Sequence, residues 1–303
     1  FDQSAFEGYK QKQEAFFSNM LSQPNFYFQQ EFYTYLNTNN PRFNGLIPTA
    51  KTWQETDYSL SYQKYKERFA NAADFEFYFV GNIDDSAIES YATKYLASLP
   101  ASENREKPVD LGYRMLAGDL KKVVNKGSDP KSNVLIMYYG EAQYSDKDAL
   151  TMHALGEIVT IKLTEQLREI ESGVYGVSAK GSLNKIPNSS YSFTIGFPCG
   201  PDNAEKLKGS ALQVLQKIID NGPEEKDLAK FKEGELSDYK NNIKENSYWL
   251  SNFIRSYTNG NSPEDVLNYE TFVNAINAKD IQNIARKYLN KDKAIGILMP
   301  EQK

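Results

Sequence analysis

The chain has 303 residues, of which 40% are hydrophobic and 25% charged, and its formal net charge at pH 7 is -5. That composition is ordinary for a globular protein, and the length allows about two domains with cores of their own. No apolar run approaches the ~20 residues of a membrane-spanning helix, and no signal peptide is visible. Basic residues are neither clustered nor interleaved with aromatic ones, which argues against nucleic-acid binding. The chain opens at Phe1 inside a helical pattern, without an initiator methionine, so we expect a piece of a longer protein.

The first hundred residues are predicted to be mostly helical. Apolar and aromatic residues recur at helical spacing in three segments, 2–22, 25–37 and 57–70. Residues 75–80 instead alternate and are rich in aromatic side chains, which predicts a strand that ends at Gly81-Asn82. A further helix is expected from about residue 84 to 97.

Residues 101–117 are polar, contain proline and have few apolar positions, as is typical of a linker. Beyond this linker, strand patterns and helical patterns alternate to the end of the chain. Strands are expected at 119–126, 134–139, 174–182, 190–198 and 294–299. Helices are expected at 145–171, in two or three pieces over 202–258, and as a pair over 263–289.

An internal repeat relates the two ends of the chain. The run 65–69 leads through a short polar turn into the strand predicted at 75–80, just as the run 285–289 leads into the strand predicted at 294–299. We therefore predict that residues 1–100 are the back half of a truncated αβ domain. Residues 118–303 would then form a complete second domain.

The chain has almost no means of holding a catalytic metal, because it contains one histidine and one cysteine. Zinc sites need three or four ligands, and the catalytic ones usually include histidine. His153 shares a helix side with Glu157 and Thr160, so we expect a partly exposed surface residue. Cys199 has no base near it in sequence, so we expect a buried or half-buried structural thiol. The sequence therefore predicts no metal site in this chain.

The candidate functional residues lie in the segment 167–177. Arg168 ends an amphipathic helix, and Tyr175 opens the next predicted strand after a break at Ser172-Gly173. This spacing can direct one guanidinium and one phenol into the same cleft. No Gly-x-Ser-x-Gly motif or glycine-rich phosphate loop accompanies them. The chain therefore lacks complete catalytic machinery of its own.

The spacing of Arg168 and Tyr175, in its helix-to-strand context, resembles the C-terminal half of the pitrilysin/insulinase family of zinc metallopeptidases. Other stretches of the chain are similar to this family as well. They are the strand and Gly-Asn-Ile over 75–83, Tyr-Leu-x-x-Leu-Pro at 95–100, Gly-Val-Tyr-Gly-Val at 173–177 and Ser-Phe-Thr-Ile-Gly-Phe-Pro at 192–198. One departure concerns the tyrosine: Val174 separates it from Gly173, whereas a glycine often directly precedes it in relatives.

The resemblance implies an α+β fold of repeated αβ domains, each with a mixed or antiparallel sheet and helices packed on one face. Four such domains form two halves that close like a clamshell over a peptide. The N-terminal half carries zinc in a His-x-x-Glu-His motif, so this chain would need no cofactor of its own. Its expected partners are that metal-carrying half and a peptide substrate, and its expected location is the periplasm or cell envelope.

The resemblance also implies roles for the two candidate residues. Tyr175 would donate a hydrogen bond to the oxyanion that forms during peptide hydrolysis, and Arg168 would bind substrate carbonyls. Without the metal-carrying half, this chain alone is expected to be inactive as a peptidase.

Several alternatives remain open from the residues. The chain could be a natural non-catalytic subunit or peptide-binding module of the same fold, or an unrelated α+β binding domain. Arg168 could instead pair with Glu165, Glu171 or the helix C-terminus, where cations are favoured. Tyr175 could be an ordinary aromatic residue on a strand.

Overall fold

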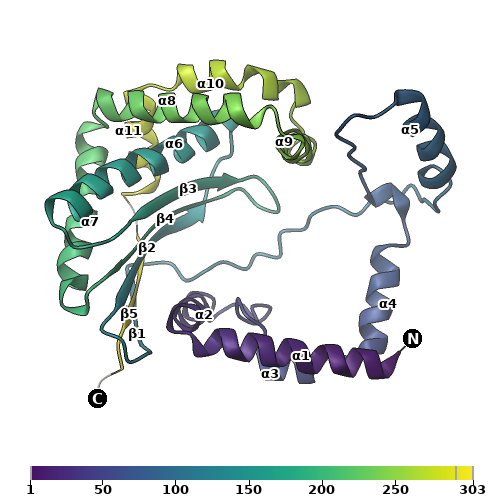
Figure 1. Cartoon of the computed structure of the whole chain (residues 1–303), viewed down its shortest axis with the longest axis horizontal. Helices are drawn as coiled ribbons and strands as arrows, with labels where there is room; N and C mark the ends of the chain where they lie inside the picture. The colour runs from purple at the N-terminus through teal and green to yellow at the C-terminus, as the bar shows by residue number, and fades with distance from the viewer. Residues whose placement is uncertain (1, 291, 302–303) are drawn as a thin grey trace.

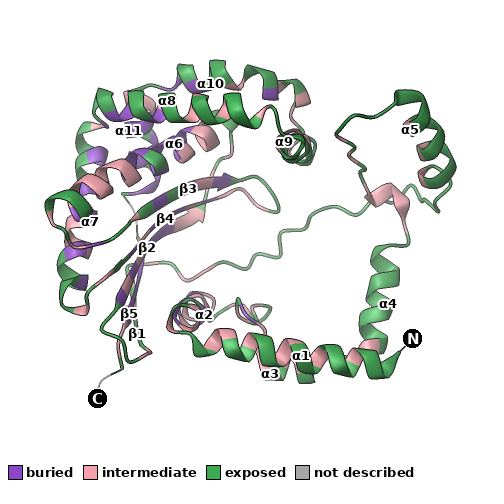
Figure 2. Cartoon of the chain, in the orientation of Figure 1, coloured by how far each residue is buried: buried purple, intermediate pink, exposed green. Residues whose placement is uncertain are grey.

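The computed structural model describes residues 2–290 and 292–301. Its first hundred residues, called the N-terminal segment below, are mainly helical, and from Leu120 onward the chain forms a layered arrangement of helices on a sheet, called the C-terminal domain below (Figure 1). Figure 2 shows that buried residues gather between the sheet and the helices of the C-terminal domain, whereas α4 and α5 of the N-terminal segment are mostly exposed. No helix in the described residues combines the length and the apolar character needed to cross a membrane.

The C-terminal domain is built on one mixed five-stranded sheet with the strand order β1-β5-β2-β4-β3. β1 runs parallel to β5, and the other neighbours are antiparallel. The strands are β1 (Leu120–Asn125), β2 (Ser132–Glu141), β3 (Ser178–Asn184), β4 (Ser190–Cys199) and β5 (Ala294–Met299). The predicted α+β class with a mixed sheet is confirmed. The strand expected at 174–182 begins only at Ser178, so Tyr175 precedes the strand instead of opening it.

Helices cover one face of this sheet except at its β1 edge, where Val123 is 47% exposed. They are α6 (Asp146–Leu163), α7 (Ala204–Asn221), α8 (Glu225–Asn242), α9 (Asn246–Asn259), α10 (Tyr269–Ala275) and α11 (Ala278–Tyr288), with short 3-10 turns at Pro201–Asn203 and Pro263–Asn268. The main core lies between these helices and the sheet, where Ile158 of α6 and Phe193 and Ile195 of β4 are fully buried. Burial alternates strictly along β4, as expected for a strand with one face in the core.

The second face of the sheet is covered over only part of its width. α1 (Gln3–Ser22) leads into α2 (Pro24–Leu36), and the aromatic side chains of α2 pack on β1, β5 and β2. Phe28 and Phe32 are buried against Leu298 and Met137. Gly296 of β5 makes this close approach possible, because a Cβ at that position would lie 2.8 Å from Cζ of Phe28.

We predict that Gly296→Ala destabilises the protein by about 1–3 kcal/mol, because the added methyl overpacks the contact with α2. The measurement is urea unfolding followed by circular dichroism. Gly209→Ala in α7 is the matched control, since a Cβ there meets nothing within 4 Å and alanine favours the helix. An unchanged unfolding midpoint for Gly296→Ala would show that α2 does not dock as described.

The strand predicted at residues 75–80 is not formed. These residues follow α4 (Tyr58–Arg68) and a 3-10 turn (Ala72–Asp74), but no other described strand lies beside them. A strand needs a neighbour for its backbone groups, so its sequence pattern alone is not sufficient. Phe77 and Phe79 consequently remain 48% and 51% exposed. The rest of the N-terminal segment is helical, with α3 (Ala50–Gln54), α5 (Asp85–Tyr91) and a π-helical turn (Ala92–Leu96).

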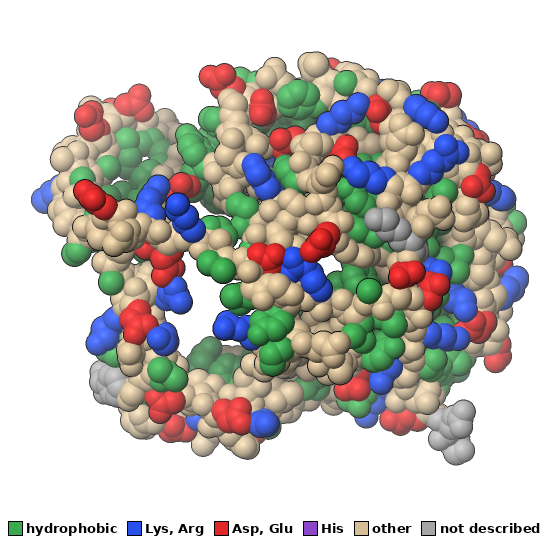
Figure 3. All heavy atoms as spheres, turned by 180° about the vertical axis from the view of Figure 1, so that it is seen from behind, with side chains coloured by type: hydrophobic (Ala, Val, Ile, Leu, Met, Phe, Trp, Pro, Cys, Tyr) green, Lys and Arg blue, Asp and Glu red, His purple; other side chains and the backbone are tan. Residues whose placement is uncertain are grey.

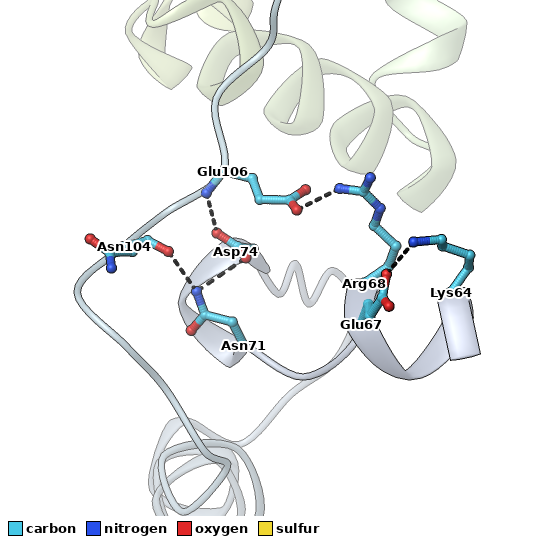
Figure 4. Close-up of polar contacts among 7 residues, drawn as sticks. All are labelled: Lys64, Glu67, Arg68, Asn71, Asp74, Asn104 and Glu106. Atoms are coloured by element: carbon cyan, nitrogen blue, oxygen red, sulfur yellow. Dashed lines mark hydrogen bonds and ion pairs between the residues drawn. The ribbon is translucent and has the colours of Figure 1, made fainter. Parts of the chain in front are cut away.

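The beginning of the predicted linker is fastened to the turn after α4 (Figure 4). Asn71 Nδ2 donates to the backbone oxygen of Asn104 at 3.0 Å and to Asp74 Oδ2 at 3.1 Å. Asp74 Oδ1 in turn accepts from the backbone N of Glu106 at 2.7 Å, and the Glu106 side chain forms an ion pair with Arg68. Residues 104–106 are therefore held by hydrogen bonds and an ion pair against the end of α4 and the turn that follows it.

His153 joins three helices through one carboxylate. Its Nε2 lies 3.1 Å from Glu235 Oε2 of α8, and the hydroxyl of Tyr269 in α10 donates to the other oxygen of Glu235. The side chain of His153 is 42% exposed, which confirms the predicted partly exposed position. The hydrogen bond to Glu235 raises the pKa of His153, and the same bond lowers the pKa of Glu235.

These shifts predict a pH window for stability. The contribution of His153 is present below its unfolded pKa of about 6.5 and is lost as pH rises through the higher folded value. The contribution of Glu235 is present above its unfolded pKa of about 4.3 and is lost as pH falls through the lower folded value. The pair therefore stabilises the fold most between about pH 4.5 and 6.5.

We predict that His153→Gln lowers the free energy of unfolding by up to about 1 kcal/mol at pH 5.5, a small effect because the pair is partly exposed. The difference from the wild type should shrink as pH rises through the raised folded pKa of His153, because the histidine is then neutral in both states. Denaturant unfolding at several pH values measures both effects. Lys287→Gln, which breaks the 3.0 Å ion pair with Asp148, is the control, because its effect should not vary between pH 6 and 8. If His153→Gln lowers the free energy of unfolding by the same amount across this pH range, the stabilising role of the charged pair of His153 and Glu235 is contradicted.

Candidate functional site

The helix that carries Arg168 ends in a π-helical turn. α6 continues without a break into π-helical residues Thr164–Ile170, and the backbone N of Glu171 donates to the oxygen of Gln166 at 3.0 Å. Such wide turns are rare and often occur at functional sites. Leu167 is fully buried and anchors the turn, whereas its neighbour Arg168 is exposed. The predicted helical position of Arg168 is confirmed.

The chain then reverses sharply. Ser172 has φ +49°, in the left-handed region that a residue with a side chain seldom adopts. The backbone N of Gly173 donates to the oxygen of Leu167 at 2.8 Å, which closes the helix end. The turn lies between Arg168 and Tyr175, and its hydrogen bond defines the course of the backbone from one residue to the other.

Gly173 holds the turn against α7. A Cβ at this position would lie 2.5 Å from Cδ2 of Leu207, so a larger residue would displace the loop or the helix. Val174 is buried beside it, and Tyr175 then projects outward with 96% of its surface exposed. The backbone before Tyr175 is thus packed while the phenol is free.

Neither candidate side chain makes a polar or ring contact with another residue that the structure describes. Arg168 and Tyr175 have no hydrogen bond, ion pair or ring contact with any of the described residues. The carboxylates that could have paired with Arg168 are engaged elsewhere. Glu165 lies 2.6 Å from Lys162, and Glu171 binds Gln166 and Lys206 at 3.0 and 3.2 Å. The structure therefore places both candidates on one short exposed segment with their donors available.

A charged cluster lies on the other side of the π-helical turn. Lys162 binds Glu165 and Glu224 at 2.6 and 3.0 Å, and Asp227 is buried 3.7 Å away. Burial lowers the pKa of Lys162, but the hydrogen bonds to the two glutamates outweigh it and raise the pKa overall. Burial raises the pKa of Asp227. These residues line a cavity of about 350 Å³ and tie the end of α6 to the start of α8.

A second cavity, of about 440 Å³, lies on the uncovered face of the sheet and was not predicted from the sequence. Its lining is polar except for Leu135 and comes from three adjacent strands. The remaining lining residues are Ser178, Lys180 and Ser182 of β3 and Ser192, Thr194 and Gly196 of β4. The signal in the sequence was the alternation of these small polar residues with buried apolar ones in both strands.

Within residues 2–290 and 292–301, no group of three or more His, Cys, Asp and Glu side chains could hold a metal ion. Cys199 is half-buried, as predicted, and burial raises the pKa of its thiol. On the face drawn in Figure 3, acidic and basic side chains are interspersed, without an extended patch of either sign.

Comparison with known proteins gives one family and several relatives. The model of the family described as peptidase M16 inactive domain matches residues 61–235. Probable zinc protease PqqL of Haemophilus influenzae is 23% identical over 244 residues, which are 78% of this chain and 26% of that protein. The chain thus spans about a quarter of this relative.

Two solved structures share the fold. The periplasmic protease PqqL from Escherichia coli superposes with a TM-score of 0.82 and 16% identity over 99% of this chain and 33% of that one. The peptidase M16 inactive domain from Pseudomonas fluorescens superposes with a TM-score of 0.81 and 16% identity over 100% and 72%. The chain therefore belongs to the peptidase M16 inactive-domain family, within the pitrilysin/insulinase group of zinc proteases.

Proposed function

We propose that this chain supplies Arg168 and Tyr175 to peptide hydrolysis at a zinc site that lies in a separate, N-terminal half of a metalloendopeptidase. The observation that carries this proposal is the pair of unused donors, a guanidinium and a phenol, on one short segment of packed backbone. Membership in the family described as peptidase M16 inactive domain supports it, together with relatives that are named zinc proteases, because a domain without a metal site in its described residues would need one supplied from elsewhere.

The chemistry follows from the two side chains. Attack of water on a peptide carbonyl builds negative charge on its oxygen, and Tyr175 donates its hydroxyl hydrogen to that oxygen. Zinc, bound in the other half, would supply Lewis acidity at the same carbonyl. The planar guanidinium of Arg168 donates to backbone carbonyls of the peptide and fixes its register.

We also propose that residues 2–100 are the back half of an αβ domain completed by another part of the protein, with 101–117 as linker. Residues 75–80 follow α4 as β5 follows α11, but β5 is paired on both sides and 75–80 are unpaired in the described chain. The proposed partners are the metal-carrying half and a peptide, and the proposed location is the periplasm or cell envelope. The periplasmic description of the Escherichia coli protease supports that location.

We predict that Tyr175→Phe lowers kcat about 100- to 1,000-fold, because one preorganised donor to the oxyanion is lost. The assay is peptide cleavage by the longer protein, or by this chain mixed with its metal-carrying half. Tyr113→Phe, which changes another exposed tyrosine, should leave turnover unchanged. Full activity of Tyr175→Phe would contradict the proposal, as would tight stoichiometric zinc binding or peptide cleavage by this chain alone.

We predict that Gly173→Ala also lowers kcat, since its methyl cannot fit against Leu207 and the segment before Tyr175 must move. Stability should fall by about 1–3 kcal/mol from the same overpacking. Gly176→Ala is the matched control on the other side of Tyr175, because a Cβ there meets nothing within 4 Å. Equal behaviour of the two variants in turnover and in thermal unfolding would show that the contact with α7 does not position the tyrosine.

A further inference from the structure

The second face of the sheet is divided into two parts of different character. Under α2, the strands β1, β5 and β2 present apolar side chains that form a core with Phe28 and Phe32. Beyond β2, the outward positions of β4 and β3 are serine, threonine, lysine and glycine, and they line the 440 Å³ cavity. The cavity is therefore lined by the strands themselves and borders the core under α2 at Leu135.

The lining residues form three consecutive cross-strand pairs. Ser178 lies opposite Gly196, Lys180 opposite Thr194 and Ser182 opposite Ser192. The hydroxyls of Ser182 and Ser192 are 2.9 Å apart. Gly196 contributes no side chain and lies between Leu135 and Ser178 on this face, so the face is hollow between these two residues.

The lining of this surface carries one positive charge. Lys180 is the one charged side chain among the lining residues, and no carboxylate is present with it. Lys180 is exposed and makes no ion pair with any residue that the structure describes. An ammonium surrounded by hydroxyl donors is complementary to a carboxylate.

The surface begins directly beyond Tyr175. Lys180 is five residues further along, and an extended chain advances at most about 3.3–3.6 Å per residue, so the two Cα atoms are within about 18 Å of each other. A peptide bound in extended form with its reacting carbonyl at Tyr175 would therefore reach Lys180 within about five residues.

We propose that the surface formed by the outward residues of β3 and β4 binds an acidic side chain of the peptide substrate, with Lys180 as the residue that determines this preference. The inference rests on the proposed function, since it assigns a side-chain preference to the same substrate. Its test measures binding alone, so the result does not depend on turnover by Arg168 and Tyr175.

The test measures binding of three fluorescein-labelled peptides of about ten residues to the 303-residue chain by fluorescence anisotropy at 150 mM salt. The peptides are identical apart from two positions occupied by Glu, Gln or Lys. The chain should bind the Glu peptide about fivefold more tightly than the Gln peptide, the value of one exposed ion pair. Lys180→Gln should remove this preference, and Lys180→Glu should reverse it toward the Lys peptide.

Lys230→Glu is the matched control, because it makes the same charge change at an exposed position of α8, on the helical side of the sheet. It should retain the preference for Glu. If the Lys180 variants keep that preference, if Lys230→Glu loses it equally, or if no peptide binds, the inference is overturned. The proposed function is tested separately, by the loss of cleavage in Tyr175→Phe. The binding preference and the proposed function can therefore fail independently.

Discussion

The alternation of side chains along β4 is the constraint on which the domain depends. Tyr191, Phe193, Ile195 and Phe197 face the helices and are buried. The residues between them face the other way and form the polar half of the second face. Because the side-chain period of a strand is two, a slip of one residue would exchange the core with this polar surface. The same pleat therefore maintains the packing of α6 and presents Lys180 and its neighbours outward.

The candidate site depends on this core through a short chain of contacts. Leu167 belongs to the core, Gly173 rests on Leu207 of α7, and Val174 is buried beside it. Arg168 and Tyr175 each follow directly after a buried residue, Leu167 and Val174, and take no part in packing. An exposed donor next to a buried residue has a defined backbone position and keeps its hydrogen-bonding capacity, which suits a group that acts on another molecule.

Much of the fold could be predicted from local patterns, and what could not depends on distant residues. The buried strands β2, β4 and β5 and the helix bearing Arg168 follow from apolar periodicity. The strand at 75–80 was wrong because pairing needs a neighbour, which its own sequence cannot reveal. The late start of β3 follows from the turn at Ser172, and serine gives little warning of a left-handed conformation. The partnership of His153 with Glu235 crosses 82 positions of the chain and has no local signal. The pair Arg168 and Tyr175 came from spacing and resemblance, whereas their lack of partners became visible only in three dimensions.

The bonds between Glu106 of the linker and the end of α4 limit how the N-terminal segment could move. Glu106 is held at Asp74 and Arg68, and at the other side Asp110 binds Arg114, which also reaches Glu141 of β2. Only residues 107–109 span the two anchored points. On the N-terminal side, α2 is packed on the sheet, and α3 is joined to α4 by residues 55–57. Any rotation of residues 58–106 would therefore have to occur at these two short connections, and it would break the ring contact between Tyr78 and Tyr257 of α9.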